Sequence, residues 1–167
     1  MHPATARTTT ATLGNGLVSF HTNPDAAAQV RADPMLLPAA IEEVLRVRTP
    51  FPRLGRIAKV DTEVGGVRIP AGQIVVPWLA AANRDQRVFT DPDRFDIHRK
   101  PNPHLSFGHG IHFCLGAPLA RLEARVAIRL LLQRYRDIEV ASNERVEQRN
   151  PWTMVAVTRL PLQVHPA

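Results

Sequence analysis

The sequence has a single cysteine, and this scarcity limits what the protein can be. With only Cys114 among its 167 residues, the chain forms no internal disulfide and is no disulfide-stapled scaffold. The first ten residues, MHPATARTTT, lack the apolar core of a secretory signal. Both features predict a cytoplasmic protein.

Long apolar runs are missing as well. The longest one, residues 74–82, contains Pro77 and is far shorter than the roughly 20 residues that cross a bilayer. The sequence therefore predicts no membrane-spanning helix.

Aromatic residues are few, at 5% of the chain, although the net charge is +6. A basic chain can bind nucleic acid, a membrane surface or an acidic protein. Binding of bases depends on aromatic stacking and on a basic stripe, whereas the arginines here are scattered along the chain. The composition argues against a nucleic-acid-binding protein.

What the chain does contain suits one globular domain. Apolar residues make up 44% and charged residues 22%, which is ordinary for a folded protein with a real core. The 15 prolines indicate many turns and irregular connections.

Helical patterns dominate the first third of the chain. An Asn-Pro pair and an Asp-Pro pair mark two helix starts, and Ile41, Val44 and Leu45 share one face of the second of these helices. An earlier helix contains Gly14 and Gly16 and resembles the end of something longer. The predicted helices span residues 8–20, 24–31 and 33–47.

After these helices, the spacing of apolar residues changes to the pattern of short strands. A Gly65-Gly66 turn separates two of these runs, and together they predict a small antiparallel sheet. The runs lie at residues 57–60, 62–64, 67–69 and 73–76, and weaker strand signals follow at 138–140, 154–158 and 160–164.

Residues 83–113 have no sustained period, which in a compact domain is typical of a functional loop. The loop leads to Cys114 and then to a predicted helix over residues 117–135. Leu119, Leu122, Val126 and Leu130 form an apolar stripe along that helix.

The segment FGHGIHFCLG, residues 107–116, places Cys114 just before this helix. The positive end of a helix dipole favours the thiolate, which is the form that binds metals. Gly108 and Gly110 permit positive φ angles, and Gly116 lets a flat, bulky group approach the backbone. A buried structural cysteine is the plainer alternative.

Zinc is a second alternative, because histidines crowd around the cysteine. Zinc sites need four ligands, usually with partners from a second segment, and the chain has no other cysteine. The candidate ligands would be His98, His104, His109, His112 and Cys114.

The stretch HLSFGHGIHFCLG, residues 104–116, resembles the heme-binding loop of the cytochrome P450 family, Phe-x-x-Gly-x-His/Arg-x-Cys-x-Gly. The matching positions are Phe107, Gly110, His112, Cys114 and Gly116. The following APLARLE resembles the family's next helix, especially in soluble bacterial members. The implied fold is mainly α with a small antiparallel β-sheet (α+β), with residues 1–167 forming the C-terminal half of the P450 fold.

The resemblance also implies roles for residues outside the loop. Glu43 and Arg46 fit the family's Glu-x-x-Arg, which pairs with a downstream arginine, here Arg94. Arg56 and His112 are expected to bond the heme propionates, while His104 receives no firm role. Residues 49–52 and 150–153 match substrate-contact segments.

The implied function is that of a heme-thiolate monooxygenase. Cys114 would be the axial ligand of heme b, a ferredoxin-type or flavin partner would deliver electrons, and one oxygen atom would enter an apolar small molecule. Family members are more than twice as long, so a missing N-terminal half is expected. The family's proton-delivery threonine aligns with Thr8, but Arg7 stands at the preceding acid position.

From this we expect little or no turnover by the 167-residue chain alone. The alternatives are a non-catalytic heme-binding remnant and a zinc-stabilised module.

Overall fold

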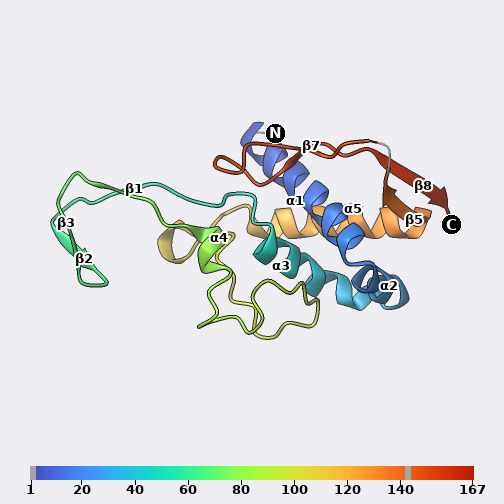
Figure 1. Ribbon diagram of the computed structural model, residues 1–167, viewed down its shortest axis with the longest axis horizontal. Coiled ribbons are helices and arrows are strands. Elements are labelled where there is room, and N and C mark those ends of the chain that lie inside the picture. The colour runs from blue at the N-terminus through green and yellow to red at the C-terminus, as the bar shows by residue number, and fades with distance from the viewer. Residues whose placement is uncertain (1–2, 142–143) are drawn as a thin grey trace.

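A helical body carries a small projecting β segment (Figure 1). The structure is a computed structural model that describes residues 3–141 and 144–167, with side chains from residue 7 onward. Its helices are α1 (Pro3–Thr22), α2 (Pro24–Ala32), α3 (Leu37–Val47), α4 (Leu79–Ala82) and α5 (Ala117–Arg134), with 3-10 turns η1 (Pro34–Leu36) and η2 (Gly110–His112).

The strands are short and pair only in twos within the described residues. Strands β1 (Arg56–Ile57) and β4 (Ile74–Val75) pair antiparallel, as do β2 (Thr62–Val64) and β3 (Val67–Ile69). Nearer the C-terminus, β5 (Tyr135–Val140) pairs with β8 (Leu162–Pro166), and β6 (Glu147–Gln148) pairs with β7 (Val157–Arg159). The prediction of a mainly helical fold with antiparallel β structure is confirmed, although the strands form separate ladders.

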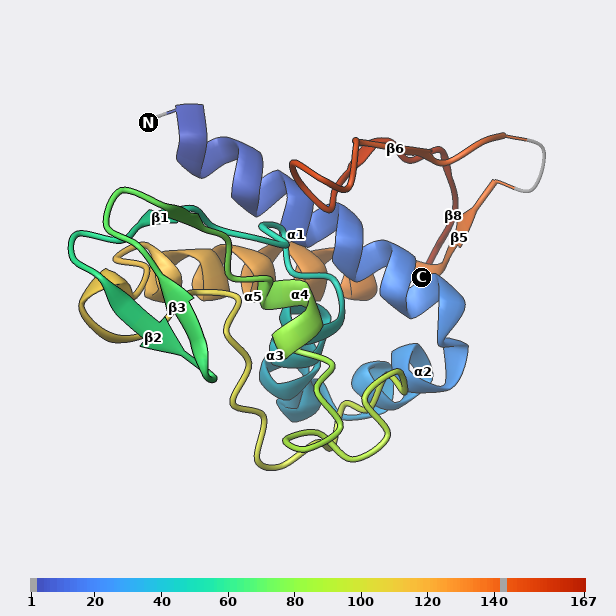
Figure 2. The ribbon, with the colours of Figure 1, turned by 60° about the vertical axis from the view of Figure 1, so that its left-hand side comes forward.

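The core lies where α1, α2, α3 and α5 meet. Helix α1 lies across α5, and Figure 2 shows the two helices crossing. Ile41 of α3 and Ile128 of α5 are each about 1% exposed, and burying a side chain of this size stabilises the fold by about 1.5–3 kcal/mol. The face predicted for α3 is therefore confirmed.

The two glycines within α1 have a packing reason. A Cβ on Gly16 would lie 3.1 Å from Ile128 Cδ1, and one on Gly14 would collide with the Val157 side chain. Glycine at these positions lets α5 and β7 approach α1 closely. The helix extends beyond the predicted residues 8–20 at both ends and spans Pro3–Thr22.

The apolar stripe predicted for α5 lies on the exposed side of the helix. Leu119, Leu122, Val126 and Leu130 are all exposed, and the side that packs into the core carries Ala117, Ala124 and Ile128. Small residues on the inner face allow α5 to lie close to α1, and the larger leucines face outward. The stripe thus correctly indicated a helix, but it is not the face that the helix buries.

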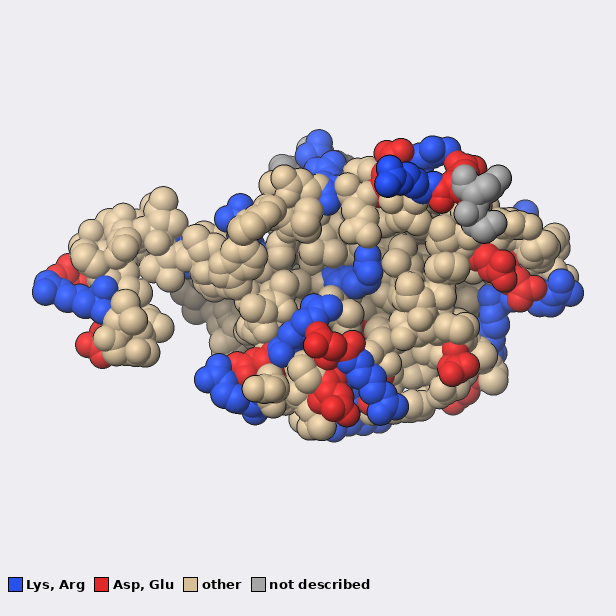
Figure 3. Space-filling view, in the orientation of Figure 1, with Lys and Arg blue, Asp and Glu red and all other residues tan. Residues whose placement is uncertain are grey.

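The β1–β4 segment projects from the body at one end of the long axis (Figure 1). On the face in Figure 3, acidic and basic side chains are interspersed over the body rather than gathered into one basic stripe. In the described part of the chain, no helix combines the length and the apolarity needed to cross a membrane.

Candidate cofactor site

The loop before α5 is shaped by its own backbone. The Cys114 N–H donates to the Phe107 carbonyl at 2.8 Å, and the Gly108 N–H donates to the Leu105 carbonyl at 2.8 Å. Gly108 and Gly110 have φ angles of +75° and +66°, where a side chain would add strain. Both glycines adopt the positive φ that the sequence suggested.

Cys114 lies directly ahead of α5, and its side chain is exposed. At the start of this 18-residue helix, the Ala117 N–H donates to the Cys114 carbonyl at 3.2 Å. A Cβ at Gly116 would lie 3.8 Å from the Cys114 Sγ. Its absence leaves room on that side of the sulfur.

A cavity of about 360 Å³ opens beside Cys114, within the size range of ligand pockets. Its walls come from α1, from the C-terminal part of α3 and the segment after it, and from α4. The ligand loop, residues 104–114, and the start of α5 complete them. The lining residues are Thr8, Thr9, Thr12, Leu45, Pro50, Phe51, Leu54, Leu79, Ser106, Phe107, Gly108, His112, Cys114, Gly116 and Ala120.

Most of the predicted site residues therefore meet in one place. Among those predicted for the cofactor or the reaction, two lie outside the lining of this cavity. Gly110 shapes the loop at η2, and Arg56 is exposed on β1, where its Nη1 donates to the Gly55 carbonyl at 2.8 Å.

The lining fits a heme group. It combines one soft sulfur donor, an apolar wall that includes Leu45, Phe51 and Leu79, and a glycine next to the sulfur where a Cβ is absent. Thiolates are among the protein ligands that hold heme iron. Cys114 is the lining residue that would hold the iron.

Thr8 is on the α1 wall of the cavity. Its backbone carbonyl accepts a hydrogen bond from Thr12 Oγ1 at 3.0 Å. Arg7, at the position of the family's acid, is exposed. An arginine stays protonated in proteins, so Arg7 cannot accept and release a proton as a carboxylate does.

Behind the loop, Glu43 and Arg46 form a fully buried ion pair on α3, with both side chains 0% exposed. Arg46 donates to both carboxylate oxygens of Glu43 at 2.8 Å. Its remaining N–H groups reach the backbone carbonyls of Asn83, Pro92 and Arg94 at 2.7–3.0 Å. All five guanidinium donors are thus satisfied, which a buried charge requires.

The downstream arginine in this network is Arg99, and the prediction of Arg94 was wrong for the side chain. Arg99 Nε lies 3.3 Å from Glu43 Oε1, and its side chain is 9% exposed. Arg94 is exposed and contributes only its backbone carbonyl, which accepts from both Arg46 and Arg99. The motif spacing identified the right segment, but the chain's turn there directs the later arginine inward.

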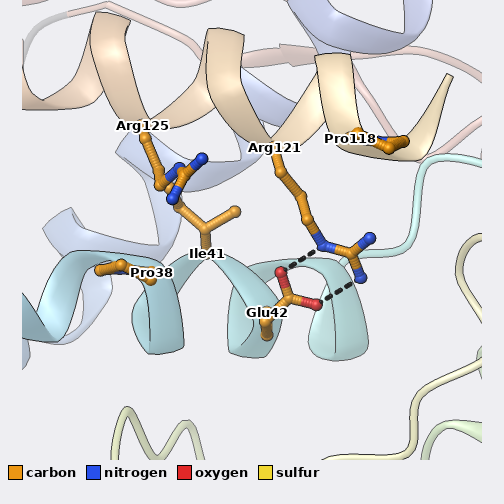
Figure 4. Close-up of a pocket in the computed structure, with 6 residues that line it drawn as sticks. All are labelled: Pro38, Ile41, Glu42, Pro118, Arg121 and Arg125. Carbon is orange, nitrogen blue, oxygen red and sulfur yellow. Dashed lines mark hydrogen bonds and ion pairs between the residues drawn. The ribbon is translucent and has the colours of Figure 1, made fainter.

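A second cluster, which the sequence did not reveal, lies on the neighbouring side of α3. Arg121 of α5 donates to both oxygens of Glu42 at 2.7 Å (Figure 4). His104 Nε2 lies 3.0 Å from Glu42 Oε2. These partners are 79 and 62 residues from Glu42 in the chain, so no local spacing could have indicated the cluster.

The Glu42 carboxyl is strongly acidic in this setting. Burial alone raises its pKa, but hydrogen bonds from Arg121 and His104 outweigh that effect and lower the pKa from 4.5 to about 2. The same hydrogen bond raises the pKa of the Arg121 guanidinium. The pair is therefore charged across the physiological range.

The histidines that suggested zinc lie apart. His104 bonds Glu42, and His98 Nε2 lies 2.8 Å from Gln29 Oε1. Within residues 3–141 and 144–167, no three His, Cys, Asp or Glu side chains are grouped as metal ligands would be. The geometry gives the zinc alternative no support.

Comparison with known proteins shows the family of this chain. A family model described as Cytochrome P450 matches residues 3–166, and the chain belongs to the cytochrome P450 family. It is 49% identical over 140 residues to the "Putative cytochrome P450 YjiB" of Bacillus subtilis, covering 84% of this chain and 35% of that relative. It is 52% identical over 133 residues to the erythromycin C-12 hydroxylase of Saccharopolyspora erythraea, covering 77% of this chain and 33% of the relative.

Solved structures give the same fold. CYP109Q5 from Chondromyces apiculatus superposes with a TM-score of 0.90 at 48% identity, covering 96% of this chain and 41% of that one. CYP109E1 from Bacillus megaterium in complex with testosterone gives a TM-score of 0.91 at 38% identity, covering 93% of this chain and 43% of that one. The chain spans about a third of the length of the curated relatives it matches.

Proposed function

We propose that this chain holds heme b, iron protoporphyrin, through the thiolate of Cys114 and forms the heme-ligand part of a monooxygenase. The observation that carries the proposal is the exposed Cys114 at the start of α5, lining a cavity of about 360 Å³. A helix N-terminus stabilises the thiolate that heme iron would bind. Residues 1–167 would then be the C-terminal portion of a larger P450 domain.

The other predicted residues have supporting roles in this proposal. Phe107, Gly108, Gly110 and Gly116 shape the surface on the sulfur side of the heme. His112 lines the cavity and would bond one propionate. Arg56 would bond the other after leaving its present partner, the Gly55 carbonyl, because a guanidinium binds a carboxylate with two hydrogen bonds.

Heme would supply a redox-active iron, and its thiolate ligand favours O–O cleavage. The protein's part is to bind and orient the heme and to control the proton supply. The Thr8 hydroxyl is the candidate proton donor on the α1 wall, but Arg7 cannot relay protons to it. We therefore propose little or no substrate turnover by this chain alone.

The substrate in this proposal is an apolar small molecule. Relatives named as a hydroxylase and an epoxidase support oxygen transfer as the reaction class. Of the two substrate-contact segments, residues 49–52 contribute Pro50 and Phe51 to the cavity, whereas residues 150–153 do not line it.

The electrons would come from a ferredoxin-type or flavin redox partner. The net charge of +6 would speed docking of an acidic partner at low salt. The single free thiol suits the reducing cytoplasm, which is the location we propose.

The test is reconstitution of the purified chain with hemin, followed by reduction and addition of carbon monoxide. A thiolate-ligated heme gives a strongly red-shifted absorption band. We expect this band from the wild-type chain and from the His98→Ala control, and its loss in Cys114→Ala. A band that survives Cys114→Ala would overturn the proposal.

A heme-binding module without catalysis is the second candidate, and Arg7 in the acid's place favours it. Product formation separates the two. If the heme-loaded chain, supplied with an electron donor and an apolar substrate, forms oxygenated product, the non-catalytic module is excluded. Consumption of electrons without product would support it.

A further inference from the structure

The Glu42 cluster connects α3 and α5 by a bidentate ion pair. Arg121 Nε donates to Glu42 Oε1 and Arg121 Nη2 donates to Oε2, each at 2.7 Å. Figure 4 shows Arg121 reaching from α5 to Glu42 on α3. Their side chains are 32% and 29% exposed, unlike the open pair Arg68–Asp61 at 79% and 56%. Partial burial and two parallel hydrogen bonds fix the direction of the guanidinium.

The same guanidinium covers the ring of Phe107 in the ligand loop. Arg121 Cζ lies 4.5 Å from the ring centroid, within the range of a cation–π contact. The Phe107 carbonyl accepts the Cys114 N–H at 2.8 Å. Arg121 therefore touches the residue whose backbone holds Cys114 in place.

His104, the first residue of the loop, bonds the same carboxylate. Its Nδ1 accepts the Ser106 N–H at 3.3 Å, which assigns the ring proton that Glu42 Oε2 accepts to Nε2. Ser106 Oγ in turn donates to the Leu45 carbonyl of α3 at 2.7 Å. The start of the loop, residues 104–107, is thus fastened to α3 through Glu42 and its partners His104 and Arg121, whose side chains do not line the cofactor cavity. Cys114, at the other end of the loop, is held through the Phe107 carbonyl.

We infer that Glu42, His104 and Arg121 are positioning residues that hold the ligand loop, residues 104–114, in its heme-accepting shape before heme arrives. A loop ordered in advance loses less entropy when it binds its ligand. The inference rests on the proposed function for Cys114 as heme ligand. The order of the loop, however, is measurable in the heme-free chain.

Arg125 is the matched control. It lies one turn after Arg121 on α5. Both arginines line a surface pocket between α3 and α5, which Pro38 and Ile41 also line (Figure 4). It has no hydrogen bond or ion pair with any described residue. Arg125→Gln removes the same charge from the same helix without touching the loop.

The first experiment measures amide hydrogen exchange in the full, heme-free chain. We expect the Cys114 amide to exchange about tenfold faster in Arg121→Gln and in Glu42→Gln than in the wild type, with Arg125→Gln within about twofold of wild type. The Arg48 amide, which donates to the Val44 carbonyl at the end of α3, reports whether the change is local. Its rate should stay constant in all variants.

Arg121→Lys keeps the charge but loses the planar fork, so we expect an intermediate exchange rate for the Cys114 amide. If Arg121→Gln does not fold, the exchange rate in Arg121→Lys is compared with that in Arg125→Lys instead. Equal Cys114 rates in the Arg121 and Arg125 variants would overturn the inference. An equal acceleration at Arg48 would also overturn it, because the cluster would then stabilise the whole fold rather than the loop.

The second experiment is hemin titration of the same variants. We expect about tenfold weaker hemin binding in Arg121→Gln and Glu42→Gln than in Arg125→Gln, and equal affinities in all three would count against the positioning role. The two hypotheses fail in different ways. A carbon monoxide band retained by Cys114→Ala overturns the heme-ligand proposal, whereas an unchanged Cys114 exchange rate overturns only the role of the cluster.

Discussion

Helix α3 presents two adjacent glutamates to very different surroundings. Glu43 is fully buried and bonds Arg46 on its own helix. It also bonds Arg99, the backbone N–H of Asp96 and the side chain of Asn102. Glu42 is partly exposed and bonds Arg121 and His104, which belong to α5 and the ligand loop. Successive residues on a helix point about 100° apart, so one turn of α3 supports two separate regions. The Glu43 network supports the fold, and the Glu42 cluster supports the ligand loop.

The largest expected effect comes from breaking the Glu43 network. Arg46→Ala leaves the Glu43 charge buried without its main partner, and we expect a loss of about 3–5 kcal/mol in the free energy of unfolding. Urea unfolding followed by circular dichroism measures it. The exposed Arg68→Ala should change stability by no more than about 0.5 kcal/mol. Equal effects of the two substitutions would contradict the contrast between buried and exposed pairs.

Acid should weaken the Glu42 cluster in a defined window. Because the folded-state pKa of Glu42 is lowered from 4.5 to about 2, its carboxylate adds stability above pH 4.5, and this contribution is lost as the pH falls toward 2. We expect at most about 3 kcal/mol, and less to the extent that solvent screens this partly exposed pair. The measurement is urea unfolding of wild type and Glu42→Gln from pH 7 to pH 2.5. A stability difference between them that stays constant over this range would refute the assignment.

Arg99→Ala tests the arginine that takes the place predicted for Arg94 in the Glu43 network. Its guanidinium bonds Glu43 and the carbonyls of Thr90, Asp91 and Arg94. Losing these bonds from a largely buried side chain should cost about 2 kcal/mol in the free energy of unfolding. A thermal or urea unfolding curve like that of the wild type would mean that Arg99 is dispensable.

The smallest effect is expected for Arg94→Ala, the matched control for Arg99→Ala. Only the backbone carbonyl of Arg94 takes part in the network, and alanine keeps that carbonyl. The free energy of unfolding should therefore change by no more than about 0.5 kcal/mol. A loss as large as that of Arg99→Ala would restore the arginine that the motif spacing first suggested.

Local signals explain what could be predicted. The helix over residues 117–135 and the Gly108 and Gly110 turns follow from periodicity and from the backbone freedom of glycine, which are properties of neighbouring residues. The pair Glu43–Arg46 is a local i,i+3 contact. The cluster of Glu42, His104 and Arg121 gave no such signal, because His104 and Arg121 are 62 and 79 residues from Glu42 in the chain.

The sequence by itself determined the family, the four longer helices and the cysteine at the start of α5, since each depends on residue types at short, fixed spacings. The tertiary structure alone decided which face of α5 is buried, which arginine joins Glu43 and which side chains reach Glu42. Those outcomes depend on how segments 50 to 80 residues apart pack against one another. Short-range spacing carries no information about such contacts.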